Sequence, residues 1–193
     1  MKKFELTNEF ITNMFGTKLF RIRALVEFGD VEAGELGGYV EKESNLGHDD
    51  NAWVYDNAWV YGNARVYGDA QVSGDARVYG NARVYGNAWV YGNAWVYGNA
   101  WVYGNALVCS DEDYAYAHGF GSVNRTTTFF RLKDGGVGVR CGCFYGTLAQ
   151  FRDKIRETHG ETKKAQEYLM LADLMELRFE EDENEVGNRK YVE

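Results

Sequence analysis

Three cysteines and three histidines are the residues of this chain best suited to metal binding or nucleophilic catalysis. Cys141 and Cys143, together with His118 or His159, could be proposed as zinc ligands. However, a spacing of one residue within a strand puts both thiols on one face, without the turn that zinc-binding cysteine pairs use. We therefore interpret both cysteines as small core residues of a hairpin, and we expect no metal site and no cofactor.

Aromatic and arginine side chains offer a different chemistry, which is binding. Most six-residue stretches between residues 51 and 110 contain Trp, Tyr or Arg, and all five tryptophans of the protein lie there. These residue types are enriched at the hot spots of protein interfaces. The sequence thus favours a contact surface over a catalytic pocket.

Ten consecutive six-residue units of the form Asn/Asp-Ala-x-Val-Tyr-Gly fill residues 51–110. A strict short period over this length indicates a solenoid. Ala-x-Val-Tyr alternates as a strand does, which sends Ala and Val to one side and the variable residue and Tyr to the other. Gly-Asn supplies a corner, because both residues tolerate positive φ. Each unit therefore predicts one short strand and one corner around a core of Val and Ala.

The array resembles the hexapeptide-repeat family in its aliphatic residue, Val54 in the first unit, and in the small residue four places later, Ala58. The resemblance implies a left-handed parallel β-helix, in which three units make one triangular coil and residue i stacks on residue i+18. The place after the aliphatic residue, usually small or acidic in the family, is here mostly Tyr. On this fold Val54, Val72, Val90 and Val108 should form one interior column.

Stacking at i+18 sorts the outward side chains onto three faces, and all five tryptophans point outward in this arrangement. The expected interaction residues on two of the faces are Trp59, Tyr61, Arg77, Tyr79, Trp95 and Tyr97, and Arg65, Tyr67, Arg83, Tyr85, Trp101 and Tyr103. Arg77 between Trp59 and Trp95 predicts a cation–π contact. The remaining face carries Trp53, and Ser73 and Cys109 interrupt its tyrosine column, so we expect that face to stay open.

Residues 1–33 precede the repeat and are expected to cap its first coil. Apolar residues alternate with others from Phe20 to Phe28, which predicts a half-buried strand. Val40 and Leu46, six residues apart, indicate two degenerate units before an irregularity at residues 48–50. These units give about four coils within residues 34–112. The segment from Arg21 onward resembles the amino end of YdcK-like uncharacterised bacterial and prophage hexapeptide-repeat proteins.

The period stops after Ser110, and residues 113–193 predict a small α+β domain. Lys133-Asp-Gly-Gly is a strong turn signal between two hairpin strands. Thr147 and Gln150 make a capping box at the start of a helix. The expected strands and helices cover residues 126–132, 137–143, 147–159 and 162–180. The acidic end, residues 180–193, is expected to fray.

The net charge of −8 and the pI near 5.0 argue against a nucleic-acid binder that follows phosphates. The amino end has no apolar stretch of the kind that a signal peptide contains, and no apolar run reaches the length of a membrane span. An odd number of cysteines argues against a disulfide framework. We therefore expect a cytoplasmic protein with no membrane contact.

These features together predict a mainly β, non-catalytic binding or scaffold protein that presents aromatic β-helix faces. The YdcK-like resemblance implies a phage or mobile-element accessory protein that occupies a macromolecular partner, for example as an inhibitor of host defence. The partner is expected to be another protein or a second copy, as in the trimers of the family. Three alternatives stay open: an acyl-coenzyme A-dependent transferase, a carbohydrate-binding module, and aromatic columns that serve stability alone. The family's catalytic histidine could only be His48.

Overall fold

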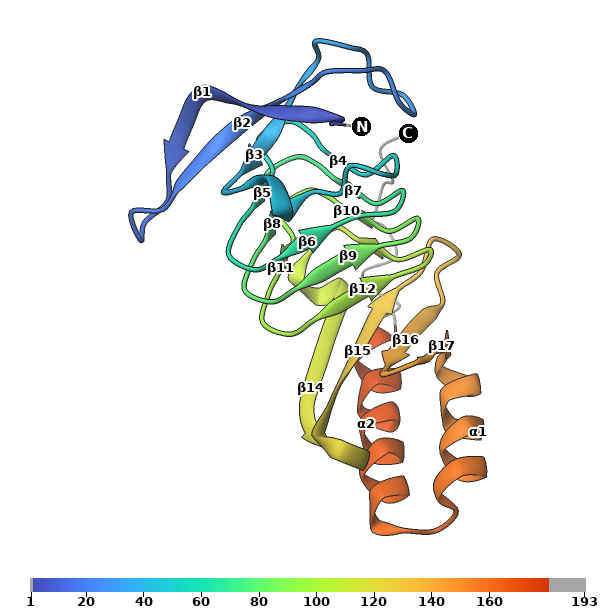
Figure 1. The fold of residues 1–193 in the computed structure, drawn as a ribbon. Coiled ribbons are helices and arrows are strands. Elements are labelled where there is room, and N and C mark those ends of the chain that lie inside the picture. The colour runs from blue at the N-terminus through green and yellow to red at the C-terminus, as the bar shows by residue number, and fades with distance from the viewer. Residues whose placement is uncertain (1, 181–193) are drawn as a thin grey trace.

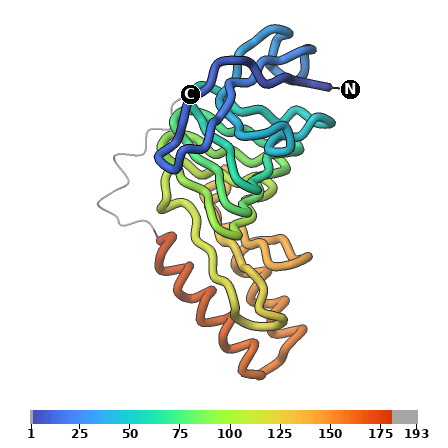
Figure 2. Tube along the Cα trace, turned by 60° about the vertical axis from the view of Figure 1, so that its left-hand side comes forward, coloured from blue at the N-terminus to red at the C-terminus, as the bar shows by residue number. Residues whose placement is uncertain are grey.

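The computed structural model describes residues 2–180. A β-solenoid forms the middle of the molecule, an antiparallel sheet lies at its N-terminal end, and a second antiparallel sheet with two helices lies at its C-terminal end (Figure 1). The rotated view shows the same three parts in line (Figure 2). No helix within residues 2–180 is long and apolar enough to cross a membrane. The acidic end that was predicted to fray lies outside the described residues, apart from Glu180.

Ten short strands form the walls of the solenoid, and each pairs in parallel with the strand three places along the chain. The first face holds β4 (Trp53–Val54), β7 (Gln71–Val72), β10 (Trp89–Val90) and β13 (Leu107–Val108). The second face holds β5 (Trp59–Val60), β8 (Arg77–Val78) and β11 (Trp95–Val96). The third face holds β6 (Arg65–Val66), β9 (Arg83–Tyr85) and β12 (Trp101–Tyr103).

The interior column predicted from the sequence is confirmed. Val54 pairs with Val72, Val72 with Val90, and Val90 with Val108, each eighteen residues apart. Every Val and Ala of the repeat between Ala52 and Val108 has an exposed fraction of 0%. The two predicted degenerate units also stack, because Val40 pairs with Val60 and Leu46 bridges to Val66. The solenoid therefore has about four coils, whereas its left-handed winding stays a prediction.

A carboxylate side chain lies at the N-terminal end of each of the three corners of the solenoid. Gly at the corners adopts positive φ, and the backbone N–H of the first Gly at each corner donates to a carboxylate. The acceptors of these groups are Glu41, Asp50 and Asp56, which bind the N–H groups of Gly62, Gly68 and Gly74 at 2.6, 3.2 and 3.0 Å. Asp56 stands where later units have Gly, and its own φ is 52°. This substitution in the first unit therefore has a structural reason.

The N-terminal sheet extends the second face of the solenoid. Strand β1 (Phe4–Thr12) pairs antiparallel with β2 (Lys18–Ala24), β2 pairs antiparallel with β3 (Leu36–Val40), and β3 pairs parallel with β5. The predicted strand from Phe20 to Phe28 is therefore wrong at both ends, and β1 was not predicted. The chain leaves the sheet after Ala24 and turns back at a tight bridge between Phe28 and Val31.

Trp53 is enclosed, although all five tryptophans were expected to point outward from the solenoid. Its exposed fraction is 0%, whereas Trp89 is 44% exposed. The rings of Phe4 and Phe28 meet Trp53 edge-on, with centroids 6.2 and 5.3 Å away. The N-terminal segment therefore covers the start of the first face. That face does not stay open at this end, contrary to expectation.

Lys3 is part of the same cover. Its ammonium group donates to the carbonyl oxygens of Asp50 and Ala52 at 2.6 and 2.7 Å, beside the Phe28 ring. Burial lowers the pKa of Lys3 to about 8, against the attraction of nearby carboxylates. The first coil is thus fastened to the amino end by both apolar and polar contacts.

The C-terminal sheet has the order β14-β15-β16-β17, and helices α1 (Leu148–His159) and α2 (Lys163–Phe179) pack on it (Figure 1). Its strands are β14 (Tyr114–Phe120), β15 (Arg125–Arg131), β16 (Val137–Cys141) and β17 (Phe144–Thr147). Strand β15 alternates between two cores, because Phe129 packs with the helices and Phe130 packs with the Val/Ala core of the solenoid. The predicted hairpin, capping box and two helices are confirmed, whereas β14 and β17 were not predicted.

The predicted strand over residues 137–143 is too long by two residues. Gly142 has a φ of 60°, which turns the chain between β16 and β17. Cys141 is consequently buried and Cys143 is exposed. The two thiols do not share a strand face, so the interpretation of both as core residues is wrong for Cys143.

Polar side chains that follow the solenoid also close its last coil. Backbone N–H groups on all three faces would otherwise be left at an open edge. The pairs are Trp95 with the Asp111 carboxylate, Trp101 with the Thr128 hydroxyl and Cys109 with the Asp113 carboxylate, at 2.6, 3.0 and 3.0 Å. The chain after residue 110 therefore covers the end of the solenoid, while its strands form a separate sheet.

Candidate functional site

The outward side chains of the second and third faces form continuous columns, because the buried Val and Ala leave only the variable residue and Tyr to point outward. Tyr61, Tyr79 and Tyr97 stack with ring centroids 5.0 and 5.4 Å apart and interplanar angles of 4° and 14°. Tyr67 and Tyr85 stack at 4.8 Å and 8°. The tyrosine rings therefore cover one another's faces along the axis of the solenoid, and their edges point outward.

Burial keeps these phenols in the neutral form. Loss of solvent raises the pKa of Tyr61, Tyr67, Tyr79 and Tyr85 above the ordinary value of 10.0. The Arg83 guanidinium acts in the opposite direction on Tyr67, to which it also donates a hydrogen bond. These four phenols are thus uncharged at neutral pH, and the charge beside them comes from arginine.

Arginine and tryptophan lie beside the tyrosines on both faces, and they alternate on the second face. Arg77 lies between Trp59 and Trp95, with its guanidinium carbon 4.2 and 4.9 Å from the two ring centroids, which confirms the predicted cation–π contact. On the third face Arg83 lies over Trp101 at 4.8 Å. Both pairs fix guanidinium groups on a rigid wall, where little conformational freedom remains to be lost on binding.

The C-terminal sheet supplies the tyrosines that end both columns. Tyr114 and Tyr116 meet Tyr97 edge-on at 6.5 and 6.3 Å, and Tyr145 meets Tyr103 edge-on at 4.6 Å. A Cβ added to the corner residue Gly104 would collide with the Tyr145 hydroxyl. The last corner is therefore open enough for a side chain from another element to take the place of a further coil.

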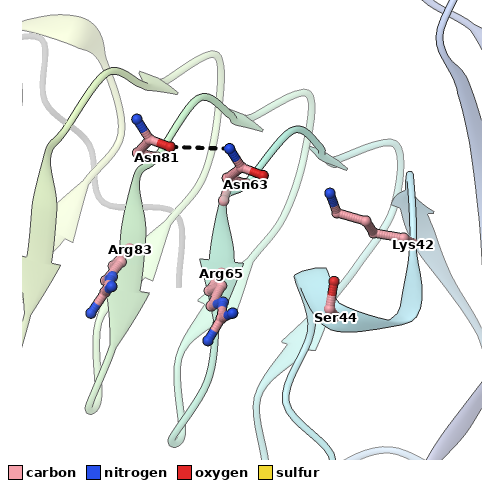
Figure 3. A pocket seen from close by; sticks show the side chains of 7 residues that line it. Lys42, Ser44, Asn63, Arg65, Asn81 and Arg83 are labelled. Carbon is pink, nitrogen blue, oxygen red and sulfur yellow. Dashed lines mark hydrogen bonds between the residues drawn. The ribbon is translucent and has the colours of Figure 1, made fainter.

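A groove with basic side chains follows the third face, next to the corner that carries Asn63. Two cavities of about 400 and 470 Å³ lie next to each other there, with Asn81 and Arg83 lining both. We call this hollow the basic groove, and Figure 3 shows its N-terminal half. Its lining residues are Lys42, Ser44, Asn63, Ala64, Arg65, Asn81, Arg83, Asn99, Trp101, His118, Arg125, Thr126 and Gly142.

The cations of the basic groove are not neutralised within the part of the chain that the structure describes. Lys42, Arg65, Arg83 and Arg125 are exposed, they form no salt bridge among residues 2–180, and no described Asp or Glu lines the two cavities. Arg65 and Arg83 are direct neighbours on paired strands (Figure 3). Like charges in this arrangement repel, and an anion between them would relieve that repulsion.

A ladder of asparagine amides forms one wall of the groove. The Asn63 amide donates to the Asn81 side-chain oxygen, and the Asn81 amide donates to Asn99, both at 3.2 Å. The first of these bonds is drawn in Figure 3. A primary amide has two N–H groups and an oxygen with two lone pairs, so each rung keeps hydrogen-bonding capacity for a ligand.

Sequence reasoning located Arg65, Arg83 and Trp101 but missed the two ends of the groove. Val60 pairs with Val40 at a spacing of twenty residues, whereas the spacing within the repeat is eighteen. This difference hid the alignment of Lys42 with the corner that carries Asn63. Arg125 enters only because β14 and β15 fold back below the last coil, and its side chain lies where a Cβ on Gly142 would be. A column search that allowed a two-residue insertion would have found Lys42. No local signal marks Arg125.

The three histidines lie on different elements, with His48 before β4, His118 on β14 and His159 at the end of α1. The His48 ring stacks on Phe4 at 4.4 Å, and its Nδ1 accepts the backbone N–H of Lys3 at 3.2 Å. Burial lowers the pKa of His48. The His118 Nδ1 lies 2.9 Å from the Thr126 hydroxyl. Among residues 2–180, no three His, Cys, Asp or Glu side chains are grouped so as to hold a metal ion.

Comparison with known families identifies the repeat. The family described as YdcK Beta solenoid repeat matches five overlapping stretches, residues 58–74, 70–82, 76–92, 82–98 and 88–104. The matched residues all lie in the walls and corners of the solenoid, and they include every residue that the repeat contributes to the basic groove. A search of curated proteins found no match.

Proposed function

We propose that this chain, whose repeat array belongs to the YdcK beta solenoid repeat family, acts as a non-catalytic binding protein. The third face of its solenoid is the proposed contact surface. The single observation that carries this proposal is the paired, un-neutralised Arg65 and Arg83 in a groove without described carboxylates. Such a pair costs stability in the free protein and gains it when an anionic partner binds. A phage or mobile-element setting, with a host macromolecule as the partner, is part of the proposal and is supported only by resemblance.

The geometry gives less support to the two alternative functions. In neutral His48, an Nδ1 that accepts a backbone N–H places the ring proton on Nε2, so neither nitrogen is ready to take a proton from a substrate. Carbohydrate sites use exposed ring faces, whereas Tyr67 and Tyr85 cover each other's faces at 4.8 Å. A binding surface that acts through arginine and ring edges agrees better with these contacts.

The test compares partner capture by three forms of the immobilised protein. These are the unmodified chain, the double variant Arg65→Gln/Arg83→Gln, and the control Arg23→Gln/Arg156→Gln. The control removes the same charge from two exposed arginines outside the groove, where Arg23 pairs with Glu5 and Arg156 with Asp153. Mass spectrometry should find partners that the unmodified and control proteins retain and the groove variant loses.

Two outcomes would change this conclusion. If all three forms capture the same proteins in the same amounts, the third face is not the contact surface. If light scattering shows that the unmodified protein self-associates and the groove variant alone dissociates, the partner is a second copy of this chain. Melting temperatures of all three forms check that folding is retained.

A further inference from the structure

We infer that the basic groove takes an acidic segment of a partner protein in extended conformation, an assignment that rests on the binding function proposed above. Charge complementarity carries it, since four exposed cations lie along one hollow of a protein whose net charge is −8. Guanidinium groups bind carboxylates in a bidentate manner.

The dimensions of the groove suit a short extended peptide. Lys42 stands one coil before Arg65, Arg83 lies one coil after it, and Arg125 lies beyond Trp101 of the last coil. Neighbouring strands lie ~4.8 Å apart, so these cations span roughly 15–20 Å. An extended chain advances ~3.3 Å per residue, which makes the groove long enough for about five or six residues.

The asparagine ladder favours a peptide backbone as the ligand. Asn63, Asn81 and Asn99 present amide groups that both donate and accept hydrogen bonds. A peptide backbone has donors and acceptors in equal supply, whereas a phosphodiester backbone has only acceptors. Side-chain carboxylates would then pair with the arginines while the main chain of the ligand follows the amides.

The aromatic side chains argue against single-stranded nucleic acid in the same place. Proteins that bind single strands through aromatic residues stack bases on exposed ring faces. Here Arg83 lies over Trp101 at 4.8 Å and Arg140 lies near the same ring at 5.6 Å. The tyrosine faces are covered by one another, so only ring edges, which carry partial positive charge, remain for the ligand.

The experiment measures the binding of a fluorescein-labelled octaglutamate peptide by fluorescence anisotropy. We expect saturable binding to the unmodified protein that weakens as salt is added. Arg65→Gln/Arg83→Gln should weaken binding by roughly tenfold or more, because two charge-assisted contacts are lost. The control Arg23→Gln/Arg156→Gln should stay within about twofold of the unmodified protein, because its charge change is remote.

Three results would overturn the inference. The first is no binding of octaglutamate to the unmodified protein, and the second is equal loss of binding in the groove and control variants. The third is tighter binding of a labelled oligothymidylate of the same length, which would assign the groove to nucleic acid. If octaglutamate fails while capture of cellular partners still depends on Arg65 and Arg83, only the acidic segment is wrong. If neither depends on these arginines, the proposed function fails as well.

Discussion

Individual residues in this protein take their roles from what lies above and below them in a column. Trp53 and Trp89 are neighbours of Gln71 on the same face and occupy the same place in their units. Phe4 and Phe28 enclose Trp53, whereas Trp89 is 44% exposed with the Lys133 ammonium 4.2 Å from its ring centre. The same residue type is therefore core at one end of a column and surface in its middle.

This contrast predicts unequal costs of truncation. Trp53→Ala should lower the free energy of unfolding by about 3–5 kcal/mol, because it leaves a cavity under the N-terminal segment. Trp89→Ala, the matched control, should cost on the order of 1 kcal/mol or less, because much of its ring is already in water. Urea unfolding of both variants checks the difference, and equal costs would mean that Trp53 is not enclosed.

The sequence alone could predict only some of these side-chain contacts. The Val and Ala columns and the Arg77 cation–π contact follow from a period of eighteen, because neighbours eighteen residues apart meet in any such coil. The cover over Trp53 could not be predicted, since it comes from Phe4, nearly fifty residues away in the sequence. Contacts between the repeat and the non-repetitive ends have no periodic signal.

At the scale of elements, the two sheets that flank the solenoid close it in different ways. The N-terminal sheet continues the second face, so the edge strand becomes β1. The C-terminal sheet lies below the last coil and places Phe130 against the Val/Ala core. Thr128 of this sheet and the preceding turn Asp111–Asp113 supply polar partners for backbone N–H groups of all three faces. Open strand edges invite association with other chains. The C-terminal closure covers such an edge, whereas the N-terminal sheet transfers it to β1.

Strand β1 escaped prediction for a reason that its pairing shows. Its apolar residues do not keep a period of two, because the register with β2 shifts between Leu6 and Phe10. A bulged strand of this kind has no clean alternation. The helices were predicted correctly because Thr147 and Gln150 form a capping box that depends only on local sequence.

A charge placed in the Val/Ala core at the middle of the solenoid should greatly reduce the stability. Val78 has an exposed fraction of 0% and pairs with Val60 and Val96 in the middle of the second face. Val78→Asp should lower the stability by several kcal/mol, because it buries a carboxylate without a partner. Gln71→Asp on the outside of the neighbouring face is the control and should change the melting temperature little. An unchanged melting temperature for Val78→Asp would place Val78 outside the core.

At the scale of the whole molecule, alkaline pH should unfold the protein through its tyrosines. Burial raises the pKa of Tyr61, Tyr67, Tyr79, Tyr85 and Tyr114 above 10.0. A group whose folded pKa is raised contributes stability that is present below its unfolded pKa and is lost as the pH rises through its folded pKa. Urea midpoints should therefore fall once the pH exceeds about 10.

The titration of Lys3 changes the stability in the opposite direction to that of the tyrosines, so the pH range of the experiment must lie above it. Its pKa is lowered to about 8 from 10.5, so the unfolded chain holds more protons in this window and the stability rises with pH there. Midpoints are best compared above pH 10.5, and the variant Lys3→Met removes the opposing contribution. If tyrosinate absorbance appears near pH 10 without loss of stability, the phenols are not held neutral by the fold.

Because the units are nearly identical, their number sets both the distance and the rotation between the N-terminal and C-terminal sheets. Because residue i stacks on residue i+18, loss of one six-residue unit would turn the C-terminal sheet by a third of a turn relative to the N-terminal sheet, with every Val still stacked on a Val. Loss of residues 69–86 would instead bring Lys42 and Arg125 one coil closer on the same corner. Recombination between repeats can thus shorten the groove in steps of three units, or divide it between two corners in steps of one.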